Sequence, residues 1–135
     1  MAALIDTSAW LFALGPKPVA AIKRIVEGYV LRHEAAGCAP VVFELLRGVE
    51  SASEASELRD YLLSLTALPV DTFAAARWAA GRSVRGARAR SMDLLIAHTA
   101  FAHRAILVHA DGDFDRLARR TGLATHSLLT EARSR

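Results

Sequence analysis

The first twelve residues constrain the fold more than any other part of this chain. A short apolar run, residues 3–5, leads into Asp6, the hydroxyl residues Thr7 and Ser8 follow, and a second apolar run occupies residues 9–12. This order predicts a short buried strand that ends at Asp6, followed by a helix that Thr7 or Ser8 caps. In open α/β sheets, ligands bind at the carboxyl ends of the strands, so we expect Asp6 at the mouth of a site.

Helical and extended patterns alternate along the rest of the chain. Apolar residues at helical spacing predict helices over residues 19–36, 40–46, 53–65, 72–84 and 92–101, and a further helix that ends at Gly122. Extended segments are predicted at residues 38–39, 68–70, 105–108 and 123–126. Ser91 is expected to cap the helix that follows it, residues 86–91 to form a mobile arginine-rich loop, and the last residues to fray. Strands that alternate with helices predict an α/β fold with a parallel sheet flanked by helices.

The composition fits one compact domain over residues 1–135. Hydrophobic residues make up 53% of the chain, which is enough for a sizeable core. No run approaches the roughly 18 apolar residues of a membrane helix, and the N-terminus lacks the basic lead of a signal peptide. The single cysteine, Cys38, excludes an internal disulfide and a cysteine-rich zinc site. These features favour the cytoplasm.

Arginine carries most of the positive charge, and its distribution is uneven. The net charge is +3 and the sequence pI about 9.6. One arginine group lies within fourteen residues and a second lies nearer the C-terminus; they are Arg77, Arg82, Arg85, Arg88 and Arg90, and Arg116, Arg119 and Arg120. Such groups are either solvated helix faces or contacts for an anionic partner, since the planar guanidinium suits phosphate oxygens.

Five acidic residues stand where an ordinary surface carboxylate is not expected. Asp6 ends a buried strand, Glu44 interrupts an apolar helix, Asp93 opens a central helix, and Asp111 and Asp113 follow the clearest strand. In a parallel sheet the carboxyl ends of the strands share one edge, so Asp6 and the turn at residues 111–113 should lie close together. The first turns of the helices that carry Glu44 and Asp93 could reach the same edge.

Each of these acids also has an ordinary explanation. Asp93 could be a first-turn residue that interacts with the helix dipole, and residues 111–113 could form a plain turn. Glu44 could extend to solvent or pair with Arg47 one turn later. Asp6 is the hardest to explain in this way, because no cation adjoins it in the sequence.

Taken together, the acids favour a metal site. Clustered carboxylates raise one another's pKa unless a cation intervenes. A set of oxygen ligands without cysteine suits a hard ion, Mg²⁺ or Mn²⁺. Such an ion can activate water and bind a phosphoryl oxygen as a Lewis acid. An acidic metal centre with arginines around it therefore suits a phosphodiester substrate.

Four segments of the chain resemble the acidic motifs of PIN-domain ribonucleases. They are LIDTSAW (residues 4–10), PVVFELLRG (40–48), MDLLIA (92–97) and DGDF (111–114). Their order and the length of the chain are most similar to the VapC toxins of bacterial toxin–antitoxin pairs. The resemblance implies a three-layer α/β/α fold with a central parallel sheet.

The resemblance also assigns roles to residues. Asp6, Glu44, Asp93 and the Asp111/Asp113 pair match the family's catalytic metal-site acids, with Mg²⁺ or Mn²⁺ as the cofactor. Thr7 or Ser8 matches a supporting hydroxyl that hydrogen-bonds a water or the metal shell. The residue two before Asp111 is often threonine in the family, whereas here it is His109. That histidine could bond a carboxylate or a phosphate, or serve the structure alone.

The implied function is a metal-dependent endoribonuclease, a toxin of the VapBC type, that uses a metal-activated water and leaves a 3′-hydroxyl and a 5′-phosphate. Expected partners are RNA, a second copy of the chain, and a VapB-type antitoxin that inserts a peptide beside the active site. Candidates for RNA contacts are Arg47, Arg82, Arg85, Arg88 and Arg90. Two alternatives remain: a non-catalytic PIN-like binding partner, and an aspartyl-phosphate phosphatase, although that class usually has a second aspartate where this chain has Ser8.

Overall fold

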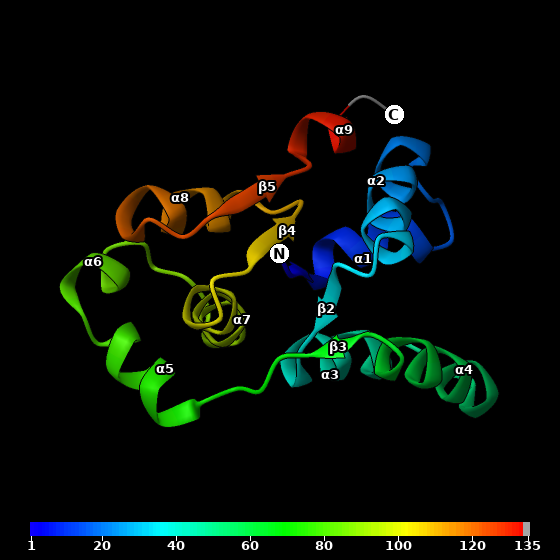
Figure 1. Ribbon diagram of the computed structural model, residues 1–135, viewed down its shortest axis with the longest axis horizontal. Coiled ribbons are helices and arrows are strands. Elements are labelled where there is room, and N and C mark those ends of the chain that lie inside the picture. Colours follow the sequence, from blue (N-terminus) through cyan, green and yellow to red (C-terminus); the bar gives the residue numbers. More distant parts are fainter. Residues whose placement is uncertain (134–135) are drawn as a thin grey trace.

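A five-stranded, all-parallel sheet forms the centre of the molecule (Figure 1). The computed structural model describes residues 1–133. The strands are β1 (Ala3–Ile5), β2 (Ala35–Gly37), β3 (Thr66–Ala67), β4 (Ile106–His109) and β5 (Thr125–Ser127). They lie in the order β3-β2-β1-β4-β5, and every neighbouring pair is parallel. The predicted parallel sheet is therefore confirmed.

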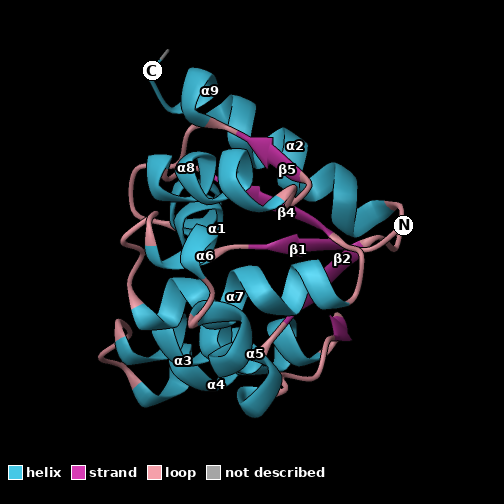
Figure 2. Cartoon of the chain, turned by 90° about the vertical axis from the view of Figure 1, so that its left-hand side faces the viewer, coloured by secondary structure: helices cyan, strands magenta, loops and turns pink. Residues whose placement is uncertain are grey.

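Helices cover both faces of this sheet. They are α1 (Thr7–Leu14), α2 (Ala20–Leu31), α3 (Ala39–Arg47), α4 (Ala52–Leu63), α5 (Thr72–Ala79), α6 (Arg82–Arg85), α7 (Ser91–Ala102), α8 (Gly112–Thr121) and α9 (Leu129–Arg133). In Figure 1, α1 and α2 lie on one side of the strands and α7 and α8 on the other. The same α7 and α8 stand in front of the strands in Figure 2. The arrangement is the three-layer α/β/α fold that the resemblance implied.

The core lies along the two central strands. Leu4 and Ile5 of β1 and Leu107 and Val108 of β4 have no solvent-exposed surface. Both faces of these strands are buried because helices cover both sides, which explains why β1 and β4 are continuous apolar runs rather than alternating ones. The residue that directly follows β1, Asp6, is buried as well.

The predicted helix over residues 19–36 is too long. α2 ends at Leu31, and His33 has a φ of 59°, a left-handed conformation that a helix cannot continue through. The N–H of Glu34 then donates to the carbonyl of Tyr29. The chain is extended at residues 35–37, which form β2 in place of the predicted strand at 38–39, and Cys38 becomes the N-cap of α3.

Two predicted helix caps are wrong by one or two positions. Asp6, rather than Thr7 or Ser8, caps α1, because its carboxylate accepts the N–H of Ser8. Arg90 is the N-cap of α7, and Ser91 is the first helical residue. In both cases the residue just before the predicted cap adopts the extended backbone that an N-cap needs.

The arginine-rich part of the chain is more regular than predicted. The expected helix over residues 72–84 divides at Gly81, whose extended backbone separates α5 from α6. The predicted loop at 86–91 begins as hydrogen-bonded turns, in which Ala87 and Arg88 donate to carbonyls of α6. Ala87 is buried and belongs to the core, so this segment is anchored to the fold.

The remaining boundaries shift by one to three residues. The clearest predicted strand, 105–108, is β4; the edge strand predicted at 123–126 is β5; and the extended piece predicted at 68–70 follows β3 rather than forming it. Where a fraying tail was expected, residues 129–133 form α9, and residues 134–135 lie outside the described part. Within residues 1–133, no helix has the length and apolar character needed to cross a membrane.

Candidate active site

The register of the central strands brings the N-terminal acid next to the turn after β4. Ile5 of β1 pairs with Val108 of β4, and the N–H of Asp6 donates to the carbonyl of Val108 at 2.9 Å. Asp6 and Asp111 therefore leave the sheet at the same edge. A pocket of about 440 Å³ opens there, and its lining includes four acids and two arginines: Asp6, Glu44, Asp93 and Asp111, with Arg47 and Arg90.

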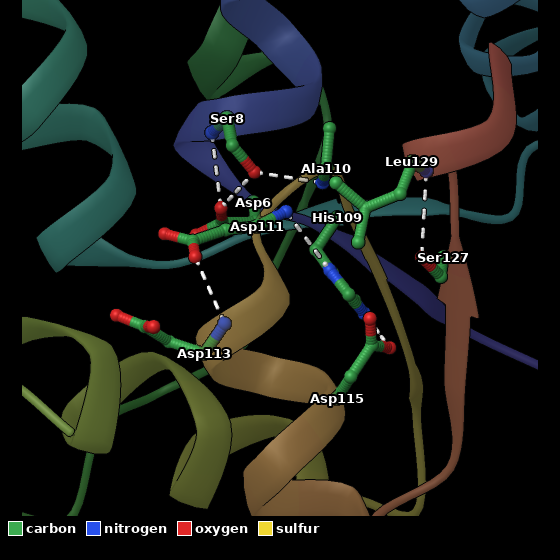
Figure 3. A network of polar contacts seen from close by, with 9 residues as sticks. All are labelled: Asp6, Ser8, His109, Ala110, Asp111, Asp113, Asp115, Ser127 and Leu129. Carbon is green, nitrogen blue, oxygen red and sulfur yellow. Dashed lines mark hydrogen bonds and ion pairs between the residues drawn. The ribbon is translucent and has the colours of Figure 1, made fainter. Parts of the chain in front are cut away.

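The tightest acidic cluster joins α7 to the start of α8. Carboxylate oxygens of Asp93, Asp111 and Asp113 lie within 4.8 Å of one another, close enough to share one metal ion. The carboxylates of Asp111 and Asp113 point to the same side of the turn (Figure 3). Asp113 also pairs with Arg116 one turn later, at 2.9 Å. All five predicted acids thus gather in one region, three of them in a tight cluster.

Asp6 is buried and held by hydrogen bonds from the helix it caps. Only 3% of the surface of Asp6 is exposed to solvent. The Oδ2 atom accepts the backbone N–H of Ser8 at 3.0 Å and the hydroxyl of Ser8 at 2.5 Å. The same hydroxyl oxygen accepts the N–H of Ala110 at 2.9 Å (Figure 3). Ser8 therefore links the acid after β1 to the turn after β4.

Thr7 holds the side chain of Glu44 by a hydrogen bond, as Ser8 holds that of Asp6. Its hydroxyl donates to Oε1 of Glu44 at 2.8 Å, so α1 orients an acid that lies 37 residues further along the chain. Of the two explanations that the sequence left for Glu44, pairing with Arg47 is not found among the ion pairs of residues 1–133. Both hydroxyls predicted to support the site thus contact its acids directly.

Burial and crowding raise the pKa values of two acids. The pKa of Asp93 rises to about 6, because its carboxyl is removed from solvent and because nearby carboxylates, led by Asp6 and Asp111, repel its charge. Burial also raises the pKa of Asp6, and the hydrogen bonds from Ser8 oppose that rise in part. Carboxylates whose ionisation is disfavoured in this way form a site that a divalent cation would stabilise.

His109 is a residue for which the sequence left three roles open: a bond to a carboxylate, a bond to a phosphate, or structure alone. It is the last residue of β4 and is fully buried. Burial lowers the pKa of its imidazole, because the charged form is disfavoured away from solvent. Its Nδ1 accepts the N–H of Asp111 at 3.2 Å. A phosphate cannot reach a side chain with no exposed surface, so contact with substrate is excluded. The histidine two residues before Asp111 was the available signal, but the sequence did not show which way its ring points.

The predicted arginines separate into two sets. Arg47 and Arg90 line the pocket with the acids. Arg82 and Arg85 lie on α6, and Arg88 lies in the turn after it; all three are exposed and none lines this pocket. The acids and the first set of arginines share one opening, which gives an acidic centre with cationic walls.

The comparisons with known proteins decide the family. The family model described as PIN domain matches residues 3–120 of this chain. The chain belongs to the PIN-domain family. Within that family, it is 37% identical over 132 residues to the VapC ribonuclease Mb1587 of Mycobacterium bovis and to the ribonuclease VapC11 of Mycobacterium tuberculosis, and each match covers 92% of this chain and 97% of the relative.

Solved structures show the same PIN-domain fold at lower sequence identity. VapBC2 from Rickettsia felis, bound to a DNA fragment from its promoter, matches with a TM-score of 0.74 at 22% identity and covers 94% of this chain and 98% of that one. FitAcB from Neisseria gonorrhoeae matches with a TM-score of 0.71 at 21% identity and covers 93% and 96%. The family and fold expected from the four motifs are thus confirmed.

Proposed function

We propose that this PIN-domain protein is the toxin of a VapBC-type pair and that it hydrolyses phosphodiester bonds in RNA. The observation that carries the proposal is the convergence of acids from α3, α7 and the ends of β1 and β4 on one pocket that also holds two arginines. The relatives at 37% identity are named as ribonucleases. Because RNA is the substrate, we place the protein in the cytoplasm.

A divalent cation, Mg²⁺ or Mn²⁺, fits the donor set. The three clustered carboxylates of Asp93, Asp111 and Asp113 supply only oxygen ligands, which hard cations prefer. We assign these three as the residues that would hold the ion, with Asp6 and Glu44 completing the site directly or through water. When bound, the cation would stabilise charge on a phosphoryl oxygen and lower the pKa of a water molecule.

The chain's own residues hold this centre in place. Ser8 fixes the orientation of the Asp6 carboxylate, and Thr7 fixes that of Glu44, so neither acid needs to reorganise when the ion and the substrate bind. Arg47 and Arg90, at the rim of the same pocket, are placed to bind the phosphates on either side of the cleaved bond. In-line attack by water then leaves a 3′-hydroxyl and a 5′-phosphate.

The direct test is cleavage of structured RNAs by the purified protein with added Mg²⁺ or Mn²⁺. We expect fragments with 5′-phosphates, and none when EDTA removes the metal. The non-catalytic alternative predicts RNA binding without fragments. The aspartyl-phosphate phosphatase alternative predicts covalent phosphorylation of Asp6, but the position that such enzymes use for a second aspartate is Ser8, whose hydroxyl already bonds Asp6 and Ala110.

The effect of replacing an arginine should depend on its distance from the acids. We expect Arg47→Ala and Arg90→Ala each to raise KM for RNA about 5-fold and to reduce the salt dependence of binding by about one phosphate contact, because each removes a guanidinium from the pocket. Arg82→Ala, on the exposed surface of α6, should have a smaller effect on KM. Arg24→Ala on α2 is the matched control; equal effects of all four substitutions would show that only net charge matters.

The antitoxin has a surface next to the site. A groove of about 1050 Å³ runs between α1, α3 and the start of α4, and it shares Leu11, Glu44 and Arg47 with the acidic pocket. Leu11 and Leu14 on its wall are 58% and 49% exposed. We assign this groove to the apolar side chains of a VapB-type peptide, whose basic residue would reach the acids. The active unit that we propose is a homodimer that joins the antitoxin in a hetero-oligomer.

A further inference from the structure

His109 occupies a position from which it can control the shape of the acidic turn. It is the last residue of β4, and its ring is fully buried against Phe114 of α8, with ring centres 5.3 Å apart. Its carbonyl accepts the N–H of Leu128 at 2.7 Å, which holds the backbone to the segment after β5. The residue is therefore fixed on both its backbone and its side chain.

The hydrogen bond at Nδ1 defines the tautomer of the ring. Nδ1 accepts the N–H of Asp111 at 3.2 Å, and a nitrogen that accepts a hydrogen bond carries no proton. The single proton of the neutral ring must then lie on Nε2. That atom is 3.5 Å from Oδ1 of Asp115, and it has no hydrogen-bond partner within residues 1–133. The carboxylate of Asp115 is placed to attract the Nε2 proton, and so favours the same tautomer (Figure 3).

Side-chain acceptors hold the backbone of the turn at three N–H groups. Ala110 donates to Oγ of Ser8 at 2.9 Å, Asp111 to Nδ1 of His109 at 3.2 Å, and Asp113 to Oδ1 of Asp111 at 2.9 Å (Figure 3). The bond from His109 is the one that acts on Asp111 itself. If this bond is lost, the peptide before Asp111 loses its side-chain acceptor, while the carbonyl of Asp111 still accepts an N–H of α8. A shift of that peptide changes the spacing of the Asp111 carboxylate from those of Asp93 and Asp113.

We propose that His109 is a positioning residue: in its Nε2–H tautomer it anchors the N–H of Asp111 and so sets the geometry of the carboxylate cluster. The proposal rests on the metal-dependent function proposed above. It assigns no substrate contact to the histidine. The competing explanation is that the ring merely fills space beside Phe114.

Two substitutions separate these explanations, because each keeps one half of the imidazole. His109→Asn places an amide oxygen near the position of Nδ1, where it can accept the N–H two residues later as in an Asx turn. His109→Gln places its amide near the position of Nε2 and leaves the N–H of Asp111 without its acceptor. Both variants lose the ring packing against Phe114, and asparagine is the smaller side chain, so a space-filling role predicts a defect in the Asn variant at least as large as in the Gln variant.

Three measurements test the proposal. Nitrogen-15 NMR of the metal-free wild-type protein should show the Nε2–H tautomer of His109, and amide exchange at Asp111 should be several-fold faster in the Gln variant than in the Asn variant. Calorimetric titration with Mn²⁺ should give affinities within about 2-fold of wild type for His109→Asn and several-fold weaker for His109→Gln. In RNA cleavage, the Asn variant should recover most of kcat and the Gln variant should not.

An Nδ1–H tautomer would overturn the proposal, and so would equal Mn²⁺ affinities of the two variants. Failure of the proposed function looks different. In that case the wild-type protein itself neither binds Mn²⁺ nor cleaves RNA, while the tautomer and the exchange at Asp111, both measured without metal, still decide whether His109 anchors the turn.

Discussion

Asp93→Asn should strongly reduce RNA cleavage and, at the same time, make the metal-free protein more stable at pH 7.5. The substitution removes the acid whose pKa burial and neighbouring carboxylates raise to about 6. An amide keeps the shape of the carboxyl group, but it neither binds a hard cation as strongly nor repels Asp6 and Asp111. We expect kcat/KM for RNA to fall about 100-fold or more, the usual effect of removing one group that stabilises charge in a transition state.

The gain in stability follows from the raised pKa. Moving the pKa of Asp93 from 3.8 to about 6 costs the folded state at most about 3 kcal/mol once the group is ionised. Solvent screens part of that cost because Asp93 is only half-buried, and the interaction of its charge with the start of α7 offsets about 0.3–1 kcal/mol. We therefore expect a net gain of about 1 kcal/mol, or a Tm higher by roughly 3–5 °C.

The control for Asp93→Asn is Asp60→Asn, on a side chain that is 71% exposed and lies outside the pocket. Activity and Tm should both stay at the wild-type level in this variant. If Asp93→Asn cleaved RNA as fast as wild type, Asp93 would not belong to the metal site. If it lost activity and also lost stability without metal, the repulsion among the carboxylates would not be the dominant force on this residue.

The candidate site could be predicted from the sequence because topology alone brings its acids together. Asp6 and Asp111 each follow an apolar strand, and parallel strands place their carboxyl ends at one edge. Asp93 lies in the first turn of α7, which approaches the same edge. Glu44 lies in the second turn of α3 rather than in its first turn, and α1 bonds it there through Thr7. Only the order of elements is needed for this step, so errors of a few residues in the boundaries, such as the end of α2, did not matter.

The contacts that orient the acids could not be predicted in this way. Glu44 accepts a hydrogen bond from Thr7 rather than pairing with Arg47, which is nearer in the sequence. Its partner depends on how α1 packs against α3, and no local sequence pattern encodes that packing. The same is true of His109, where the sequence gives the residue but not the direction of Nδ1. The end of α2 was missed because His33 takes a left-handed backbone without being glycine.

Metal affinity should rise steeply between pH 5 and pH 7.5. Asp93 holds its proton up to a pH of about 6 in the metal-free fold, and burial raises the pKa of Asp6 in the same direction. A hard cation binds the ionised carboxylate, so it must displace the proton. For one proton at this pKa, the affinity for Mn²⁺ at pH 5 should be about 10-fold lower than at pH 7.5, and a proton on Asp6 would make the difference larger.

The stability of the metal-free protein should fall as pH rises, whereas its metal affinity increases. The folded pKa of Asp93, about 6, exceeds the unfolded value of 3.8, so between these values the folded state binds more protons and its free energy of unfolding falls as pH rises. The stability that the protonated Asp93 contributes is fully present below pH 3.8 and is lost above a pH of about 6. Saturating Mn²⁺ should cancel this loss, since the cation takes the place of the proton.

Thermal unfolding from pH 4.5 to 7.5, with and without Mn²⁺, measures both effects at once. The increase in Tm caused by the metal should be small at the acid end and large at the neutral end. Asp93→Asn should show a weak increase at every pH, and the difference between its curve and that of wild type isolates Asp93 because every other titrating group is common to both. A metal-induced increase that is independent of pH in the wild-type protein would remove Asp93 from the proposed metal site.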